Sequence, residues 1–449
     1  MSTPEQESPE GLAATGRLVS RSRRVDDVSF PAFLADSDSP RVHWASPAGL
    51  ELAGSGAAAR LTATGDDRFD RLRADARTLF DRLDHEGPAV TRPRAVGGLS
   101  FDADHDPIPP WESFPAARFL VPAVQLTRAD DATHLTAAVY GPDADRAAVV
   151  ERLDAAQRRL AALPMMQSSG GPPGVAARRW LTDRADWIAQ VADATDRIAD
   201  GRLLKVVLAT ALSVELDAPV SVPAVLERLR RTYPDCYRFL VQPGDGAAFF
   251  GPPPERLVEL DGRAVRTEAL AGSMPRGDTP EADAEHARSL LESEKIRHEQ
   301  ALVADTVREQ LSAYGDVTVG ERGVRQLTNI QHLQTPITAT LSADRHVLEL
   351  VAALHPTPAV GGLPLDGALA TIRETETFDR GWYASPVGWF DADGDGEFAV
   401  GIRSGLVDGT SATLFAGNGI VADSDPAAEW EELQPKVRPI LDELTDDRA

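Results

Sequence analysis

The sequence predicts an α+β fold with large mixed or antiparallel sheets flanked by helices. Short apolar segments with the alternation of strands follow one another closely, and turn residues separate them. Segments 247–250, 256–260 and 264–268 are the clearest example, and their short connections favour antiparallel pairing. Longer segments repeat apolar residues at helical spacing. At 449 residues the chain is long enough for a two-lobed protein.

The N-terminal third is predicted to form a lobe over residues 16–174. Its polar first residues, 1–15, are predicted to be a disordered tail. The predicted elements are a helix over 68–83, strands over 95–101, 119–126 and 135–140, and a helix over 146–163. The stretch 167–174 is rich in Gly, Pro and Ser and is the best linker candidate, so a second domain is predicted over 175–449.

The second domain begins with a predicted helix over 185–200 and an almost wholly apolar strand over 203–212 that contains Lys205. One long helix is predicted over 282–314, followed by strands over 387–391, 397–404 and 412–416 and a last helix. The acidic segment 391–396 resembles the start of a calcium-binding loop, but Ile402 stands where that loop needs a bidentate Glu. We therefore predict a hairpin turn there.

The charge excludes several classes of partner. Asp and Glu number 70 against 46 Lys and Arg, which gives a formal net charge of -24. Binding to nucleic acid needs a basic surface, so nucleic acid is not an expected partner, and anionic membranes are disfavoured for the same reason. The sequence has no apolar segment of membrane-spanning length and no signal-peptide pattern at its start. With Cys236 as its one cysteine, a cytoplasmic protein is expected.

The basic residues are almost all arginine, because Lys205, Lys295 and Lys436 are the three lysines of the sequence. Many acidic residues with few lysines are typical of a protein kept soluble in high salt, where screening weakens charge repulsion. A halophilic protein is therefore predicted. Lysines that survive such a bias are expected where an ammonium group is chemically needed, so all three are active-site candidates.

Two segments point to carboxylate chemistry. Glu255 follows Gly251-Pro252-Pro253-Pro254 at a rigid turn between two strands, where the alternative reading is a capping or surface carboxylate. Glu299 lies in a predicted helix at the edge of the apolar stripe, where the alternative is an ordinary salt-bridged helix. Between them, the small residues after Glu268 indicate that the backbone passes something closely.

A third acidic segment lies near the C-terminus. Gly417-Asn418-Gly419 leads into Glu429 and Glu432, whose i, i+3 spacing places both carboxylates on one face of a helix, as a divalent cation requires. The alternative is an acidic helix without a ligand.

Together these segments resemble the chorismate-utilising enzyme family, which includes isochorismate, salicylate, anthranilate and aminodeoxychorismate synthases. The resemblance extends from about residue 203 to the C-terminus and implies that 175–449 is a chorismate-binding catalytic domain with a chorismate-binding fold. The resemblance rests on the order of the motifs along the sequence. These motifs are Lys205, Pro254-Glu255, Leu270-Ala271-Gly272-Ser273, Lys295 with Glu299, Gln331-His332-Leu333, His355-Pro356-Thr357-Pro358, Tyr383, Arg403, and Gly417 to Lys436.

The resemblance implies roles for these residues. Lys205 would be the general base that activates water, and Glu255 would be the general acid that protonates the departing ring hydroxyl. Glu299 and Glu432 would bind Mg²⁺ directly and Glu429 through water, and the metal would hold the ring carboxylate of chorismate.

The remaining residues would bind the substrate. Tyr383 and Arg403 would grip the enolpyruvyl carboxylate, and backbone amides at Gly417 and Gly419 would cradle one carboxylate. The rest of the implied substrate-binding set is Leu270, Gly272, Ser273, His332, Ala359 and Lys436. The sequence departs from the usual pattern at Ile296, Gln300 and Pro435, and the last could displace Lys436.

Within the family, the sequence resembles the isochorismate synthases. The amine-adding members have a Pro-Ile-Ala-Gly type of loop where this chain has Ala269-Leu270-Ala271-Gly272, so no glutaminase partner is expected. Salicylate synthases tend to have Thr where this chain has Ala359. The expected reaction is conversion of chorismate to isochorismate, with menaquinone or siderophore synthesis as its destination and the former preferred. Salicylate synthase, an anthranilate or aminodeoxychorismate synthase component and a non-catalytic acidic binding protein are the alternatives.

Overall fold

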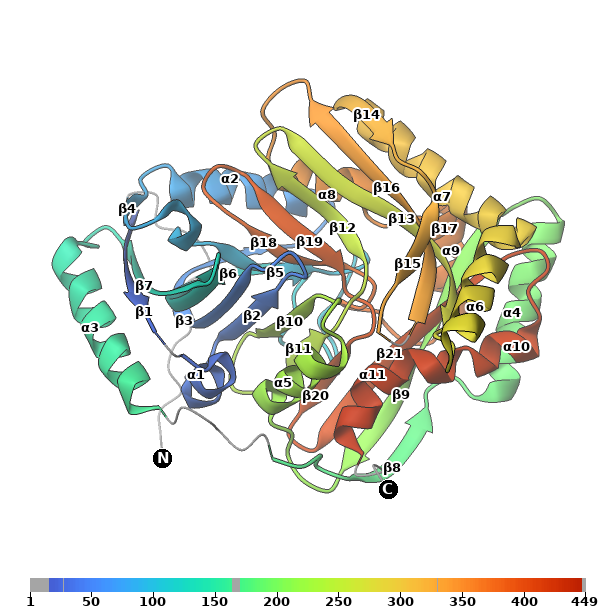
Figure 1. The fold of residues 1–449 in the computed structure, drawn as a ribbon, viewed down its shortest axis with the longest axis horizontal. Helices are drawn as coiled ribbons and strands as arrows, with labels where there is room; N and C mark the ends of the chain where they lie inside the picture. The colour runs from blue at the N-terminus through green and yellow to red at the C-terminus, as the bar shows by residue number, and fades with distance from the viewer. Residues whose placement is uncertain (1–15, 27, 164–169, 329, 446–449) are drawn as a thin grey trace.

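A computed structural model describes residues 16–26, 28–163, 170–328 and 330–445. The predicted tail over 1–15 and residues 167–169 of the predicted linker lie outside the described residues. The strands of the N-terminal part lie on the left of the molecule in Figure 1, and most strands of the rest of the chain lie at the centre and on the right. Helices flank the sheets, which confirms the predicted α+β class.

The N-terminal part is built on long antiparallel strands. β3 pairs with β6, β6 with β7 and β7 with β1, while the short β4 runs parallel to β1. The elements are β1 (Arg17–Val25), α1 (Phe30–Asp36), β2 (Arg41–Ala45), β3 (Glu51–Ala63), α2 (Arg68–Phe80), β4 (Asp84–Glu86), the 3₁₀ turn η1 (Ala89–Thr91), β5 (Ala95–Leu99), β6 (Ala117–Ala129), β7 (Ala132–Gly141) and α3 (Arg146–Ala162).

The rest of the chain adds two further groups of strands. The longest pairings are β9 with β21 and β13 with β16, both antiparallel. The strands are β8 (Val175–Trp180), β9 (Lys205–Leu216), β10 (Arg238–Gln242), β11 (Ala248–Gly251), β12 (Arg256–Asp261), β13 (Ala264–Pro275), β14 (Gly315–Val319), β15 (Gly323–Gln326), β16 (Ile330–Leu341), β17 (Gly362–Leu363), β18 (Pro386–Phe390), β19 (Gly396–Val400), β20 (Gly405–Asp408) and β21 (Ser411–Ile420).

Helices cover these strands. Helix α7 packs on β13 and β16, and α11 packs on β21 (Figure 1). The helices are α4 (Arg184–Ala199), α5 (Val222–Thr232), α6 (Pro280–Glu292), α7 (Glu294–Ser312), α8 (Val347–Leu354), α9 (Leu365–Thr375), α10 (Pro426–Glu431) and α11 (Leu433–Leu444). None of the helices in the described residues is long and apolar enough to cross a membrane.

Hydrogen bonds between strands cross the predicted boundary at residue 174. β2 pairs with β10 and β5 pairs with β18, both in antiparallel register. The buried side chains form one hydrophobic core that includes Trp44 and Phe119 from the N-terminal part and Phe249 and Phe390 from the rest. The N-terminal part therefore supports the sheets that carry the site described below, while the predicted boundary itself stays a prediction.

The prediction of one long helix over 282–314 is wrong in one respect, because the structure has two helices there, α6 and α7, which are separated at Ser293. Ser293 ends α6 and begins α7, and its hydroxyl accepts a hydrogen bond from the Ile296 amide. A serine in extended conformation caps a new helix readily, and the apolar repeat continues on both sides of the break. The predicted hairpin turn at 391–396 is confirmed, because β18 and β19 pair across it.

Candidate active site

A cavity of about 170 Å³ lies where the ends of β9, β13 and β21 meet helices α7 and α11. It collects most of the residues predicted for the site from distant parts of the sequence. They are Lys205, Glu255, Leu270, Gly272, Glu299, His332, Ala359, Tyr383, Arg403, Gly417, Gly419 and Lys436. Among the predicted residues whose side chains are described, Glu429 and Glu432 do not line it.

Lys205 is the first residue of β9, and its side chain is 4% exposed. Its Nζ donates a hydrogen bond to Glu299 Oε1 on α7 over 2.6 Å, so the predicted base and one predicted metal ligand are in direct contact. Gly419 on β21 makes room for this pair. A Cβ at that position would lie 2.7 Å from Lys205 Cε and 3.4 Å from Glu299 Oε1.

Glu255 reaches the cavity from the proline-rich turn before β12, and it is 7% exposed. Its carbonyl oxygen accepts a hydrogen bond from the Val400 amide, which fixes the turn to β19. The pKa of Glu255 is raised to about 8, first by burial and then by the nearby Glu268, while Lys205 and Arg325 oppose the shift. The carboxyl group therefore keeps its proton at neutral pH, which is the form that a general acid needs.

The small residues predicted to allow a close approach do so at Gly272. Its φ of +63° lies in the left-handed region, and a Cβ there would lie 2.5 Å from Ile296 Cγ2 on α7. The His332 ring donates from Nδ1 to the Gly272 carbonyl oxygen over 3.0 Å. Burial lowers the pKa of His332 to about 4, so the ring is neutral. Ser273 pairs with His332 through its backbone, and its side chain lies outside the described residues.

Two predicted carboxylate-binding residues lie on another wall of the cavity. Tyr383 is buried and stacks on Phe415, with ring centroids 5.2 Å apart, and burial raises its pKa to about 12. Arg403 has a φ of +54°, a conformation that costs a non-glycine residue energy and that often occurs at functional sites. Its Nη1 donates to the Pro435 carbonyl oxygen over 3.4 Å. The phenol and the guanidinium thus offer donors to an anion.

Lys436 brings a second cation to the cavity despite the preceding proline. Helix α11 begins at Leu433, so Pro435 lies in the first turn, where a backbone N–H has no partner within the helix. Lys436 Nζ donates to the Gly417 carbonyl oxygen over 2.9 Å and to Asn418 Oδ1. The pKa of Lys436 is lowered to about 8, first by burial and then by Arg403.

The three predicted metal ligands surround Lys436 but occupy different environments. Glu299 lines the cavity, Glu429 is 8% exposed on α10, and the Glu432 side chain is 63% exposed with Oε2 3.9 Å from Lys436 Nζ. Glu432 caps α10 with a helical backbone (φ −70°, ψ −16°), and its amide donates to the Ala428 carbonyl oxygen over 3.1 Å, so the shared helix face of Glu429 and Glu432 stays a prediction. All three nonetheless exert their charge on Lys436 and raise its pKa.

The chemistry of these three carboxylates suits a divalent cation. Carboxylate oxygens are the ligands that Mg²⁺ prefers. The space beside Gly419 leaves Glu299 accessible from the cavity. Across the described ranges, no group of three or more His, Cys, Asp or Glu side chains is close enough to hold a metal. The donor set therefore fits Mg²⁺ in its chemistry, while the assignment of these residues as ligands stays a prediction.

Several cavity residues were missed by the sequence analysis. The most informative is Arg380, whose guanidinium is paired with Glu376 and donates to the carbonyl oxygens of Val207 and Val360 over 2.7 and 3.0 Å. Its donors are thus used to hold one wall of the cavity together. The i, i+4 spacing of Glu376 and Arg380 was a signal of pairing, but it gave no indication of the cavity. The other missed residues are Val207, Val360, Ala384, Ile402, Phe415 and Ala416, while Pro254 and Ala271 line the cavity as parts of the predicted motifs.

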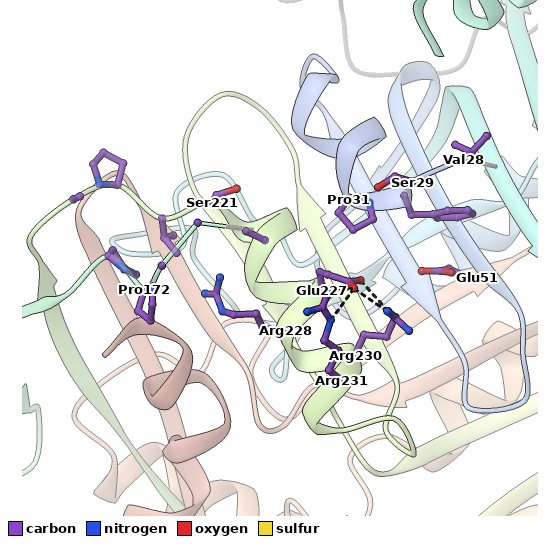
Figure 2. Close-up of a pocket in the computed structure, with 18 of the residues that line it drawn as sticks. Val28, Ser29, Pro31, Glu51, Pro172, Ser221, Glu227, Arg228, Arg230 and Arg231 are labelled. Atoms are coloured by element: carbon purple, nitrogen blue, oxygen red, sulfur yellow. Dashed lines mark hydrogen bonds and ion pairs between the residues drawn. The ribbon is translucent and has the colours of Figure 1, made fainter. Parts of the chain in front are cut away.

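A larger cavity of about 700 Å³ lies elsewhere, between the start of α1, helix α5 and the segment after residue 170 (Figure 2). Its arginines are paired with carboxylates. Arg230 and Arg231 both bind Glu227, and Arg228 binds Glu443. None of the predicted site residues lines it. The smaller cavity is therefore the candidate active site, because it combines acid, base and anion-binding groups.

The fold and this site define an enzyme that combines a buried acid, a lysine and an anion-binding wall. The profile of the family described as "chorismate binding enzyme" matches residues 8–445, and the chain belongs to this family. The family predicted from the motifs is thereby confirmed.

Two relatives illustrate the similarity. The chain is 35% identical over 413 residues to the salicylate biosynthesis isochorismate synthase of Pseudomonas aeruginosa, covering 91% of this chain and 86% of that protein. It is 36% identical over 387 residues to the isochorismate synthase MenF of Bacillus subtilis, covering 85% and 81%. Among solved structures, MenF, the menaquinone-specific isochorismate synthase from Escherichia coli, superposes with a TM-score of 0.81 at 27% identity, covering 98% and 97% of the two chains.

Proposed function

We propose that this enzyme is an isochorismate synthase, which converts chorismate to isochorismate. The observation that carries the proposal is that Lys205 and a protonated Glu255 line one buried cavity together with Arg403 and Lys436. The names of the relatives in Pseudomonas, Bacillus and Escherichia support the same activity.

The anion-binding wall suits the substrate, because chorismate carries two carboxylates. Arg403 can donate two parallel hydrogen bonds to the enolpyruvyl carboxylate, and the hydroxyl of Tyr383 can add a third. Lys436 and the backbone around Gly417 line the same cavity, and Lys436 adds positive charge for the second carboxylate.

The reaction divides into two proton transfers. Lys205 accepts a proton from water as the water oxygen bonds to ring carbon 2 and both ring double bonds shift by one position toward carbon 4. Glu255 gives its proton to the hydroxyl on carbon 4, and the bond between that carbon and oxygen breaks to release water. One water enters and one leaves, so the product is an isomer of the substrate. The buried position of Glu255 keeps its proton available for this second step.

We also propose that Mg²⁺ is the cofactor. Glu299 and Glu432 would hold it directly and Glu429 through water, and when bound it would neutralise and orient the ring carboxylate of chorismate. The support is the carboxylate chemistry of these residues and their common position around Lys436.

Two features favour water addition without a further reaction. Ala359 lines the cavity and has no hydroxyl that could orient the pyruvyl group for elimination to salicylate. Leu270 and Ala271 line the cavity where the amine-adding enzymes have a Pro-Ile-Ala-Gly type of loop. Lys205 lines the same cavity and would activate water. No glutaminase partner is therefore proposed.

The test is to incubate the protein with chorismate, with and without Mg²⁺, in high salt and to identify the products by chromatography. Isochorismate is expected. Salicylate with pyruvate would instead assign the lyase, and an aminated product with ammonia would assign an amine-adding enzyme. A protein that binds chorismate but makes no product would be a non-catalytic binding protein, and the proposal would fail.

For the destination of the product, we propose menaquinone synthesis in the cytoplasm. The solved Escherichia coli relative is a menaquinone-specific enzyme, whereas the Pseudomonas relative is an enzyme of salicylate biosynthesis. Deleting the gene and measuring menaquinone and salicylate in the cells separates the two. Loss of menaquinone alone is expected.

A further inference from the structure

A second buried carboxylate lies beside the predicted acid. Glu268 on β13 is 9% exposed, and its Oε1 accepts hydrogen bonds from the Arg256 backbone amide over 3.2 Å and from Arg325 Nη1 over 2.6 Å. Its Oε2 accepts from Gln334 Nε2. The Arg256 amide belongs to the peptide that directly follows Glu255. Glu268 is thus attached to the backbone of the acid.

The sheet explains why these groups meet. β12 and β13 form an antiparallel hairpin, and the Thr267 hydroxyl donates to the Leu257 carbonyl oxygen over 2.6 Å. Side chains alternate along a strand, so Glu268 projects to the same face of β13 as Leu270, which lines the cavity. The register of β12 also shifts between Arg256 and Val258, where the strand leaves the turn of Glu255. Glu268 therefore supports an irregular stretch of backbone next to the site.

The charge of Glu268 favours the protonated form of Glu255. Besides burial, the groups that act on its pKa are Glu268 from β13, Lys205 from β9 and Arg325 from β15. The effect of Glu268 is the largest of these three and raises the pKa, whereas the two cations lower it. Two carboxylates in one site disfavour a second negative charge.

We propose that Glu268 is a positioning residue for Glu255, because it holds the backbone after the acid through the Arg256 amide and its negative charge keeps the proton on Glu255. The inference rests on the proposed function, in which Glu255 protonates the leaving hydroxyl. It gives a role to a glutamate that contributes no side chain to the cavity lining.

The test uses two substitutions that are expected to shift the pKa of Glu255 in opposite directions. Glu268→Gln keeps the size and an oxygen that can accept from the Arg256 amide, but it removes the charge. The upper pH limit of kcat/KM is therefore expected to fall by about one pH unit. Arg325→Gln removes an opposing cation and is expected to move the same limit upward. The matched control is Glu285→Gln, which removes one carboxylate that is exposed on α6 and paired with Arg288. It should leave the profile unchanged.

A second measurement does not depend on turnover. The carboxyl vibration of Glu255 is identified by infrared difference spectroscopy as the signal that Glu255→Gln removes, and it is titrated against pH in wild type and in each variant. The midpoint is expected to fall in Glu268→Gln and to rise in Arg325→Gln. Unchanged midpoints in both variants would overturn the role of Glu268. If one variant does not fold, the direction of the midpoint shift in the other variant tests the role of Glu268.

The two proposals fail in different ways. A wild-type protein that makes no isochorismate refutes the proposed function, while the infrared titration still tests Glu268. A wild-type enzyme that makes isochorismate, combined with an unmoved Glu255 titration in both variants, refutes the positioning role alone.

Discussion

The protonation of Glu255 provides the most direct test of the proposed mechanism. Its pKa is raised from an ordinary value of 4.5 to about 8. At pH 7 about nine in ten molecules then carry the proton, compared with about three in a thousand for an unperturbed glutamate. We therefore expect kcat/KM to be constant near neutrality and to fall about tenfold for each pH unit above 8.

Glu255→Gln should remove this upper limit together with the acid itself. Turnover of chorismate is expected to fall by about 10²- to 10⁴-fold, the usual contribution of a positioned general acid, while chorismate binding is retained. The assay follows isochorismate formation by chromatography between pH 6 and pH 10, with binding measured by calorimetry. A variant that kept wild-type turnover, or that kept the same upper limit, would refute the role of Glu255.

The same shift has a consequence for stability. A carboxyl group whose folded pKa lies above its unfolded pKa favours the folded state at low pH, and this contribution is lost as the pH rises from 4.5 to about 8. The loss is about 1.4 kcal/mol per pH unit, with an upper bound of about 5 kcal/mol. Glu255→Gln cannot ionise, so denaturant unfolding should show it gaining stability over wild type between pH 5 and pH 8. A difference in unfolding free energy between Glu255→Gln and wild type that is equal at pH 5 and pH 8 would contradict the raised pKa of Glu255.

Other parts of the site give further predictions. Lys205→Ala should still bind chorismate but lose about 10²- to 10⁴-fold in turnover. Turnover by Lys205→Arg should be nearly as low, because a guanidinium cannot accept the proton. Isochorismate formation by Lys205→Arg at a rate near that of wild type would refute the role of Lys205 as the base. Glu299→Gln and Glu432→Gln should weaken Mg²⁺ binding in calorimetry by about tenfold or more, and unchanged affinity in either would remove that residue from the ligand set. Ala359→Thr should still add water and should raise the yield of salicylate and pyruvate, and a product ratio equal to wild type would disprove the role of this position.

The parts of the site that sequence predicted correctly depend on local structure. Pro252, Pro253 and Pro254 restrict the backbone before Glu255, so a rigid turn followed by a strand could be predicted from these residues alone. Lys205 lies in a strand that its almost wholly apolar run of residues identifies. The gathering of these segments in one cavity was predicted by the family resemblance, since spacing alone cannot bring together residues from distant strands.

The parts that were missed depend on contacts between distant segments. The break at Ser293 is invisible in the apolar repeat, because α6 and α7 both follow that repeat. Arg380 could be paired with Glu376 by spacing, but its contacts with Val207 and Val360 follow from how β9 and the segment after α8 pack.

The distribution of lysine connects composition to the site. Arginine serves as the surface cation of this chain, as in the ion pairs of Arg230 and Arg231 with Glu227. Lys205 and Lys436 line the cavity, and each makes contacts that suit a compact ammonium, whereas the side chain of Lys295 lies outside the described residues. Lys205 fits beside Gly419 against one oxygen of Glu299, and Lys436 donates to two acceptors on β21.

A guanidinium is a planar fork with five donors and keeps its proton at every physiological pH. At position 205 it would be too large for the space beside Gly419 and could not act as a base. At position 436 its fork would not match the Gly417 and Asn418 oxygens, and its proton could not be released as readily as that of a lysine whose pKa is lowered to about 8. A composition that replaces lysine by arginine elsewhere therefore has a chemical reason to keep lysine at these two positions.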